Sequence, residues 1–379
     1  MPDTVEIGLG RSVRRGYRLD EVALVPTRRT RGTSKVSMSW QIDAHHFRLP
    51  FVAAPSDAVV SPSTAVEVER LGGLAVLDGE GLWTRYEDPT AALATIADPA
   101  TDPSTVQRIY AAPVSTDLLA QRIKELRSTD VRVAVRVSPQ HAVELAPVAL
   151  SAGVDVLVVQ GTVISAEHVV NERHGETAPE ALNLKEFVAD VDIPVLVGGC
   201  SNYQTALHLM RSGAAGVIIG FGDHAGALTP SVLGIDVPMA TALVDAAAAR
   251  RDYLDETGGR YVHLIAYGAL RCGGDITKAI ACGADAVMLG EALAVAEEAP
   301  GGGAYWDATV GHPRVPRSTV VPPRPGTRVP LEQVLRGPAE TGDAHTNLFG
   351  SARRAMAKCG YSSVKEFQRA ELTLVTPRD

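Results

Sequence analysis

A glycine-rich loop, GFGDHAGALTPSVLG at positions 220–234, follows the apolar run 215–219. Gly222 would let the backbone come close to a ligand, because glycine has no side chain to block the approach. Thr229 and His224 are the groups of the loop that could exchange protons with a bound molecule. The loop contains no cysteine and no arginine. It could therefore shape a pocket, but it offers no strong nucleophile.

Polar residues and glycines also follow the other apolar runs. Tyr267 could donate a proton, Glu80 could relay one, and glycine N–H groups could approach an anion. Tight turns would require many of the same glycines, so this pattern alone leaves both readings open. The candidates for ligand binding at these positions are Ser56, Asp57, Gly222, His224, Gly268, Gly290 and Glu291, together with Gln160, Gly161, Thr162, Gly198 and Gly199.

Eight short β-rich runs, separated by helical patterns, would position these residues. The runs are 50–54, 74–77, 132–137, 155–159, 194–197, 216–219, 261–266 and 285–289. Strands that alternate with helices indicate a parallel α/β fold, and eight of them predict a (β/α)8 TIM barrel with its chemistry at the carboxyl ends of the strands. Helices are expected at 203–212 and 275–281, the second with Asp275 as its N-cap.

We expect one barrel domain over residues 1–379. Residues 1–49 form an N-terminal lead-in, and 301–342 form a long loop rich in Gly, Pro and Arg. A loop of this length in a barrel is typical of an active-site flap or of an oligomer contact, and we favour the flap. Residues 343–379 form a C-terminal helix, near 350–358, and a tail.

Composition excludes several classes of function. The net charge is −8 with no basic cluster, so a nucleic-acid partner is not expected. No signal sequence and no run of about 18 apolar residues is present, which predicts a cytoplasmic protein with no membrane partner. The four cysteines lack disulfide density and metal-ligand spacing, so we expect reduced thiols and no metal site. A small-molecule substrate is the remaining expectation.

Several long stretches resemble the inosine monophosphate dehydrogenase and guanosine monophosphate reductase family, in particular its short actinobacterial branch. They include LGGLAVLDGEG at 71–81, AGVDVLVVQGT at 152–162, GGCSNYQTALHLMRSGAAGVIIG at 198–220 and GGDITKAIACGADAVMLG at 273–290. The resemblance covers nearly the whole chain. It implies a TIM barrel, NADPH or NADH as cofactor, a purine-like substrate and a homotetramer. Residues 83–130 are too few for the regulatory modules that many members carry there.

The chain departs from this family at its catalytic loop, whose pattern is Gly-x-Gly-x-Gly-Ser-x-Cys-Thr-Thr-Arg. By alignment, the phosphate-binding serine is Ala225, the nucleophilic cysteine is Ala227 and the arginine is Pro230. The ribose-binding aspartate is Tyr267, and Glu291 follows a further phosphate contact. The family's cofactor-contacting aspartate corresponds to Gln160, so the resemblance implies that the cofactor binds at Gln160, Gly161, Thr162, Gly198 and Gly199. The family's flap Arg-Tyr pair is missing, and its monovalent cation is doubtful here.

These changes favour reduction over oxidation. Oxidising a purine at carbon needs a nucleophile first, and Ala227 cannot supply one, whereas a reduced nicotinamide can deliver hydride directly if a donor protonates the product. We therefore predict a reductase of a purine-like or deazapurine nucleotide or nucleoside. The alternatives are a dehydrogenase in which Cys200 or Cys272 replaces the nucleophile, and an inactive nucleotide-binding regulator.

Three polar residues allow more than one interpretation. Glu291 would repel a phosphate, which favours a nucleoside or base, unless it pairs with Arg271. Asp57 matches a substrate neighbour of the family but could instead cap the helix that begins near Ser61. Arg136, on the third strand, could bind a ligand or face a carboxylate such as Asp155.

Overall fold

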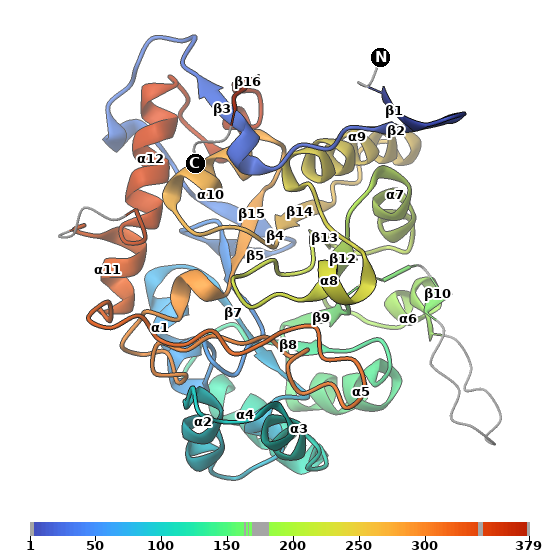
Figure 1. Ribbon diagram of the computed structural model, residues 1–379, viewed down its shortest axis with the longest axis vertical. Helices are drawn as coiled ribbons and strands as arrows, with labels where there is room; N and C mark the ends of the chain where they lie inside the picture. Colours follow the sequence, from blue (N-terminus) through green and yellow to red (C-terminus); the bar gives the residue numbers. More distant parts are fainter. Residues whose placement is uncertain (1–3, 163, 166, 169–181, 340–343, 377–379) are drawn as a thin grey trace.

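Eight parallel strands close into a barrel in the computed structural model, which describes residues 4–162, 164–165, 167–168, 182–339 and 344–376 (Figure 1). Neighbours in the barrel follow the order of the chain, and the pairing of Val287 with Phe51 joins the last strand to the first. The predicted TIM barrel is therefore confirmed, with one strand inside or overlapping each predicted run. The strands are β6 (Phe51–Ala53), β7 (Leu74–Asp78), β8 (Ala134–Val137), β9 (Val156–Gln160), β12 (Val195–Cys200), β13 (Gly216–Ile219), β14 (His263–Ala266) and β15 (Ala286–Leu289).

The interior of the barrel is filled by branched and small apolar side chains, as layers of such residues fill most barrels of this size. They are Val52, Leu74, Val76, Ala134, Val156, Val158, Leu196, Ile218, Ile265, Ala286 and Met288. A hairpin of β4 (Trp40–Ile42) and β5 (His45–Phe47) packs against them. Trp40 lies edge-on to His263, which starts β14, so the hairpin closes the amino-terminal end of the barrel.

Helices surround the barrel and bury their apolar faces against it. Those that follow or flank the strands are α1 (Pro62–Leu71), α4 (Thr116–Arg127), α5 (Ala142–Ala152), α6 (Leu184–Ala189), α7 (Tyr203–Arg211), α9 (Met239–Thr257), α10 (Gly273–Ala281), α11 (Leu331–Arg336), α12 (Leu348–Lys358) and α13 (Val364–Phe367). The helices predicted at 203–212 and near 350–358 are present as α7 and α12. The N-cap of α10 was predicted wrongly: Cys272 caps the helix, and Asp275 accepts hydrogen bonds from the N–H groups of Arg271 and Cys272 three to four residues back.

Three helices occupy the segment between β7 and β8 that was too short for regulatory modules. They are α2 (Thr90–Ala97), α3 (Pro103–Tyr110) and α4, preceded by the short turn η3 (Leu82–Thr84). Figure 1 shows α2, α3 and α4 grouped on one side of the barrel. The last residue of α3, Tyr110, is 8 % exposed and reaches the carboxyl ends of the strands.

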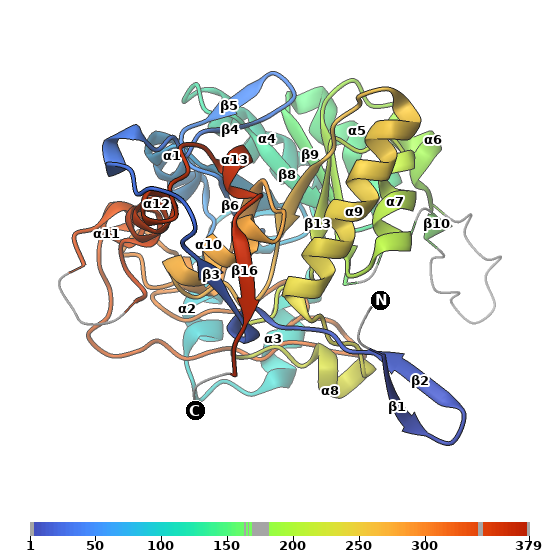
Figure 2. The ribbon, with the colours of Figure 1, turned by 90° about the horizontal axis from the view of Figure 1, so that it is seen from above.

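The N-terminal lead-in contributes to two small antiparallel sheets outside the barrel. β1 (Thr4–Gly8) and β2 (Arg11–Arg14) make a hairpin that projects from the body in both views (Figures 1 and 2). After the turn η1 (Leu19–Glu21), β3 (Val22–Val25) pairs antiparallel with β16 (Glu371–Leu374), so the two ends of the chain share a small sheet.

The remaining elements are the turns η2 (Thr33–Lys35) and η4 (Glu291–Leu293), the pair β10 (Glu167–His168) and β11 (Leu182–Asn183), and α8 (Thr229–Leu233).

The segment predicted as one long loop, which we call the strap (residues 301–339 as described), contains α11 near its end, and its irregular part runs along the glycine-rich loop 220–228. The N–H of Thr319 donates to the carbonyl of Gly226 at 2.8 Å, and the N–H of Leu228 donates to the carbonyl of Arg317 at 2.7 Å. Within the strap, Tyr305 and Val321 pair as an antiparallel bridge. Residues 340–342 of the predicted flap lie outside the described residues.

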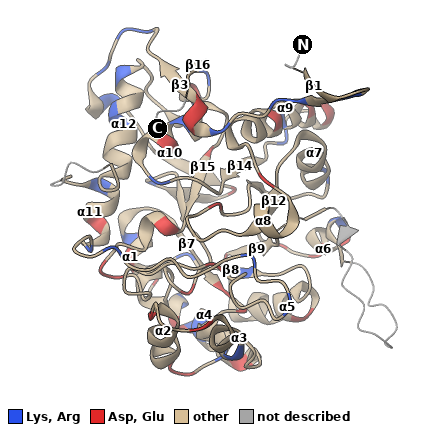
Figure 3. Ribbon diagram, viewed as in Figure 1, with Lys and Arg blue, Asp and Glu red and all other residues tan. Residues whose placement is uncertain are grey.

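Charged residues of both signs are interspersed over the face drawn in Figure 3. Across the described parts of the chain, no helix combines the length and the apolar character that crossing a bilayer needs.

One buried ion pair joins α9 to the start of β15. The carboxylate of Asp285 accepts from Arg250 at 2.6 Å, and it also accepts from the N–H of Leu264 and the hydroxyl of Tyr261. Removing one partner leaves an uncompensated buried charge, so we expect Asp285→Ala to lower the free energy of unfolding by about 3–5 kcal/mol in urea titrations.

The surface pair between Arg14 and Asp245, 2.8 Å apart, provides the matched control. Asp245→Ala is expected to cost under about 1 kcal/mol, since solvent screens this pair. Equal losses in the two variants would contradict the assignment of Arg250 and Asp285 as a buried pair on which the fold depends.

Candidate active site

Arg136 stands at the carboxyl end of β8 among three neighbouring strands. Its guanidinium lies 3.1 Å from Asp78 and 3.7 Å from Glu80, and it donates to the backbone carbonyl of Gln160 at 3.0 Å. Asp78 and Arg136 face each other in the register of β7 and β8. Arg136 thus faces a carboxylate, as one of the two interpretations expected, but the partner is Asp78. Asp155 is not the partner, because it precedes β9 at the opposite end of the barrel and binds Arg127 at 2.9 Å.

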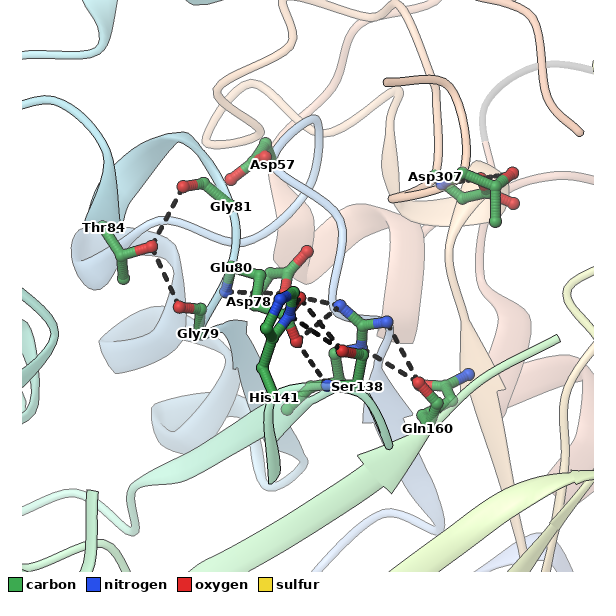
Figure 4. Close-up of polar contacts among 12 residues, drawn as sticks. Asp57, Asp78, Gly79, Glu80, Gly81, Thr84, Ser138, His141, Gln160 and Asp307 are labelled. Atoms are coloured by element: carbon green, nitrogen blue, oxygen red, sulfur yellow. Dashed lines mark hydrogen bonds and ion pairs between the residues drawn. The ribbon is translucent and has the colours of Figure 1, made fainter. Parts of the chain in front are cut away.

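Glu80 connects Arg136 to a histidine at the rim. Its carboxylate accepts from Ser138 and lies 2.6 Å from Nδ1 of His141 (Figure 4). Burial opposes ionisation, but the charge of Arg136 and the hydrogen bond of His141 lower the pKa of Glu80 to about 2. The same hydrogen bond raises the pKa of His141 above its usual value. Glu80 therefore stays ionised at neutral pH, and His141, half exposed, is the member of the pair that can carry a proton.

Asp57 belongs to a second, fully buried group on the other side of Asp78. It accepts from the N–H of Leu82 at 3.0 Å and from the hydroxyl of Tyr110 at 2.8 Å, and Trp306 of the strap donates to Tyr110 at 2.8 Å. Asp57 does not cap α1; Ser61 does, by accepting from the N–H of Thr64. Burial and the negative charge of Asp78 raise the pKa of Asp57 to about 7. Asp57 thus lies beside the site without a free oxygen directed at it.

The hydroxyl of Ser56 is also already hydrogen-bonded, in this case to the strap. Its hydroxyl donates to the backbone carbonyl of Trp306, and the residue is 2 % exposed. Ser56 therefore anchors the strap over the barrel and has no free donor for a ligand in this conformation.

Two tyrosines fill the space above the glycines of β13 and β15. Tyr267, after β14, and Tyr305, from the strap, share a hydrogen bond between their hydroxyls. A side chain at Gly222 would overlap the ring of Tyr267, and one at Gly290 would overlap the hydroxyl of Tyr305. The cavity that remains between them is about 20 Å³, which is space for one or two water molecules. Burial raises the pKa of Tyr267 far above its usual value, so it is a phenol at neutral pH.

His224 ties the glycine-rich loop to the strap. Its Nδ1 accepts from the N–H of Gly226 at 3.1 Å, so the proton of a neutral ring is on Nε2. Nε2 lies 3.3 Å from both Asp307 and Ser318. Because the serine and the aspartate share one ring nitrogen, this group is not a nucleophilic triad, in which they occupy opposite nitrogens. Thr229 opens α8 next to this group and is 9 % exposed.

Glu291 directs its carboxylate at the glycine-rich loop. Oε2 accepts from the N–H of Ala225 at 3.0 Å, while Nε of Arg271 lies 3.9 Å away. The pairing with Arg271 left open by the sequence is thus present but loose. The N–H of Ala269 donates to the carbonyl of Asp223 at 2.7 Å, next to Gly268. The N–H groups of Ala225 and Ala269 are therefore both used within the protein.

The strand ends proposed to contact the cofactor differ in which hydrogen-bonding groups remain available to a ligand. The N–H groups of Gly161 and Gly199 donate to the carbonyls of Gly198 and Gly161, and a side chain at Gly199 would overlap the carbonyl of Gly220. These glycines are required by the packing of neighbouring strands. Thr162 accepts from Nε of Arg317 at 3.0 Å. Gln160 differs from these residues because its side chain keeps an acceptor without a partner.

Gln160 is 8 % exposed, and its side-chain Oε1 has no hydrogen-bond partner. Figure 4 shows it beside Ser138, with Asp307 farther along the mouth. A buried acceptor without a partner costs free energy unless a ligand supplies the donor. Among the residues that the structure describes, no three His, Cys, Asp or Glu side chains are arranged to hold a metal ion.

A family model described as the IMP dehydrogenase / GMP reductase domain matches residues 16–310. The chain belongs to this family. It is therefore an oxidoreductase, of the class that works with a nicotinamide cofactor and a small nucleotide-like substrate.

Individual relatives agree with this assignment. The chain is similar to uncharacterized oxidoreductases of Mycobacterium tuberculosis, at 52 % identity over 98 % of this chain and 99 % of that protein, and of Mycolicibacterium smegmatis, at 51 % identity with the same coverage. An IMP dehydrogenase/GMP reductase-like protein of Corynebacterium glutamicum has a crystal structure with a TM-score of 0.92, 48 % identity and 98 % coverage of both chains. An inosine-5′-monophosphate dehydrogenase of Methanocaldococcus jannaschii is 29 % identical over 62 % of this chain.

Neither thiol considered as a replacement nucleophile of this family is activated. Cys200 is 1 % exposed, and burial raises the pKa of its thiol to about 11. Cys272 caps α10, and burial together with Asp275 raises the pKa of its thiol. A neutral thiol is a poor nucleophile, since the thiolate is the reactive form.

Three functional candidates escaped the sequence analysis: His141, Tyr305 and Asp307. His141 lies 61 positions from Glu80, and only the adjacency of β7 and β8 brings them together. Tyr305 and Asp307 belong to the strap, which carries no periodic signal. Parallel pairing of neighbouring strands could have indicated His141 as a partner of Glu80.

The raised pKa of Asp57 makes a prediction about stability. The folded state holds the proton of Asp57 more tightly than the unfolded chain, whose value is near 3.8. The stabilisation of the folded state by this tighter proton binding is complete below about pH 4 and is lost as pH rises through about 7. Between pH 5 and pH 8 the free energy of unfolding of the wild type should therefore fall by about 2–3 kcal/mol more than that of Asp57→Asn, in urea titrations. Parallel curves for the two proteins would contradict the raised pKa.

Proposed function

We propose that this protein is an NAD(P)H-dependent reductase of a purine-like or deazapurine ring, resembling guanosine monophosphate reductase but working without a covalent cysteine. The observation that carries the proposal is the state of the thiols. The loop position of the nucleophile is Ala227, and Cys200 is buried with its thiol neutral. Direct hydride delivery to an electron-poor C=N or C=C bond needs no nucleophile, so it is the chemistry that the remaining groups support.

A reductase also needs a proton for the atom next to the one that receives hydride. The pair of Glu80 and His141 supports this role, because an ionised carboxylate holds a partly exposed imidazole by a 2.6 Å hydrogen bond and favours its protonated form. Glu80 is thus proposed to hold the proton carrier in place, which refines its role as a relay. Tyr267, a neutral phenol, is proposed to donate a hydrogen bond to the substrate, and Thr229 to line the same pocket.

The nicotinamide cofactor would supply the hydride. Gln160 fits such a group, because its orphaned Oε1 can accept a hydrogen bond from an amide N–H such as that of a carboxamide. Gly161, Gly198 and Gly199 would provide flat backbone beside it, and Thr162 would mark its edge. The choice between NADH and NADPH is left to the assay.

The substrate is proposed to carry no phosphate at the family's usual position. Ala225 aligns with the phosphate-binding serine, and its N–H already donates to Glu291. A phosphate there would displace this bond and face a carboxylate at close range, which is unfavourable by several kcal/mol at intermediate dielectric. A nucleoside or base is therefore favoured over a nucleotide. By likeness to the family we also propose a cytoplasmic homotetramer.

Entry of a ring requires the strap to withdraw. In the closed arrangement Tyr267 and Tyr305 leave about 20 Å³ over Gly222 and Gly290. Tyr305 is on the strap, so its displacement opens this space while the glycines stay in the barrel. Closure after binding would exclude water from the ring, as active-site lids do.

The direct test is a turnover screen. Loss of nicotinamide absorbance is followed with NADH and NADPH against purine and deazapurine bases, nucleosides and their 5′-phosphates. We expect turnover with a member of the unphosphorylated set. Turnover only with 5′-phosphates would overturn the phosphate argument, and absence of turnover with any pair, while binding is retained, would support a regulatory role instead.

The Glu80 and His141 pair predicts a pH signature. His141→Gln should lower kcat by about 10²–10⁴, the usual contribution of a general acid. Glu80→Gln removes the group that raises the pKa of His141, so the alkaline limb of the rate profile should move to lower pH.

His208→Gln, an exposed histidine on α7, is the control and should leave kcat and the pH profile unchanged. An unmoved alkaline limb in Glu80→Gln would rule out His141 as the proton donor.

A further inference from the structure

A second cavity adjoins the one between the tyrosines, and Arg271, Glu291 and Tyr305 line both. It has a volume of about 70 Å³, room for several water molecules or one small charged group. Its walls come from η4, the strap and the segment before α12. They include Ala292, Ala294, Val295, Val321 and Pro322, so most of the lining is apolar.

Thr346 places an unpaired hydroxyl in this cavity. The residue is 7 % exposed, it lines the cavity, and its Oγ1 has no hydrogen-bond partner. A buried hydroxyl without a partner is destabilising, and most buried polar groups in proteins are paired. The hydroxyl of Thr346 is therefore available to a ligand.

Two arginines give the cavity a positive rim. Arg271 and Arg324 both line it, and His345 lies between them. Nδ1 of His345 donates to the backbone carbonyl of Arg271 at 3.1 Å, and Nε2 lies 3.5 Å from Nη1 of Arg324. The histidine thus connects the two arginine segments. Among the described residues of the lining, Glu291 is the carboxylate, and its Oε2 accepts from the N–H of Ala225 on the other side.

We infer that this cavity binds the oxyanion of a small organic acid, a carboxylate or phosphate group on a short apolar body. Arg271 and Arg324 would face the charge, the hydroxyl of Thr346 would donate to one oxygen, and the alanine and valine walls would pack against the body. The inference goes beyond the proposed reductase, because it requires neither the nicotinamide cofactor nor turnover. The acid is either a group of the substrate that reaches past Glu291 or a separate molecule.

Thermal denaturation of the full chain tests the cavity with sodium phosphate and sodium propionate, at ionic strength held constant with sodium chloride. Binding to the folded state alone raises Tm, because it stabilises that state by RT ln(1 + L/Kd), where L is the free ligand concentration, and we expect a rise of about 1–3 °C for at least one probe. Arg324→Gln should lose most of this rise. Arg353→Gln, which removes an exposed arginine of α12 outside the cavity, should keep it.

Thr346→Val is the most informative variant, because its hydroxyl makes no bond in the protein. Without a probe its Tm should equal or exceed that of the wild type, and with a probe the rise should be lost. No rise in the wild type, or an equal rise in Thr346→Val and the wild type, would overturn the site. Once turnover is measured, competition between probe and substrate would assign the cavity to an acidic group of the substrate. Independent binding of the two would assign the cavity to a separate acid. Failure of the reductase assay leaves the thermal result intact.

Discussion

The buried charge of Arg136 is the constraint on which the mouth of the barrel depends. A guanidinium at a strand end in the interior is costly unless carboxylates and carbonyls surround it. Asp78 and Glu80 on β7 and the carbonyl of Gln160 on β9 supply that compensation. Glu80 is thereby kept ionised and can hold His141, while the negative charge of Asp78 helps to keep Asp57 protonated near neutral pH. Arg136 thus favours the ionised form of Glu80, whereas burial is the main cause that raises the pKa of Asp57 and of Asp78.

The barrel was predictable because its signals are local. Each strand of the barrel is a run of apolar, mostly branched residues, and helical periodicity separates the runs, as in α7. The wrong assignments concern helix starts where more than one residue could be the N-cap. Asp275 and Cys272 both stand near the start of α10, and Ser61 and Asp57 both precede α1; only the backbone geometry decides which one caps.

The placement of the candidate residues was predictable, but only part of their contacts was. Carboxyl ends of parallel strands converge, so Glu80, Gln160, Tyr267 and Glu291 were expected at one end of the barrel, where the structure has them. Their contacts depend on register and on a segment without periodicity. Arg136 meets Asp78 because the two residues are opposite each other in neighbouring strands, whereas Asp155 is at the far end of its strand. The filling of the pocket by Tyr305 could not be predicted, since nothing in the strap's sequence fixes where it crosses the barrel.

The backbone pairing between the strap and the glycine-rich loop also constrains kinetics. Gly226 and Leu228 bond to Thr319 and Arg317, while Arg317 reaches Thr162 on the side proposed for the cofactor. The sides proposed for the substrate and for the cofactor are therefore covered by one continuous segment of chain. On that proposal, displacement of this single segment would admit both ligands, and their association rates would share one conformational step.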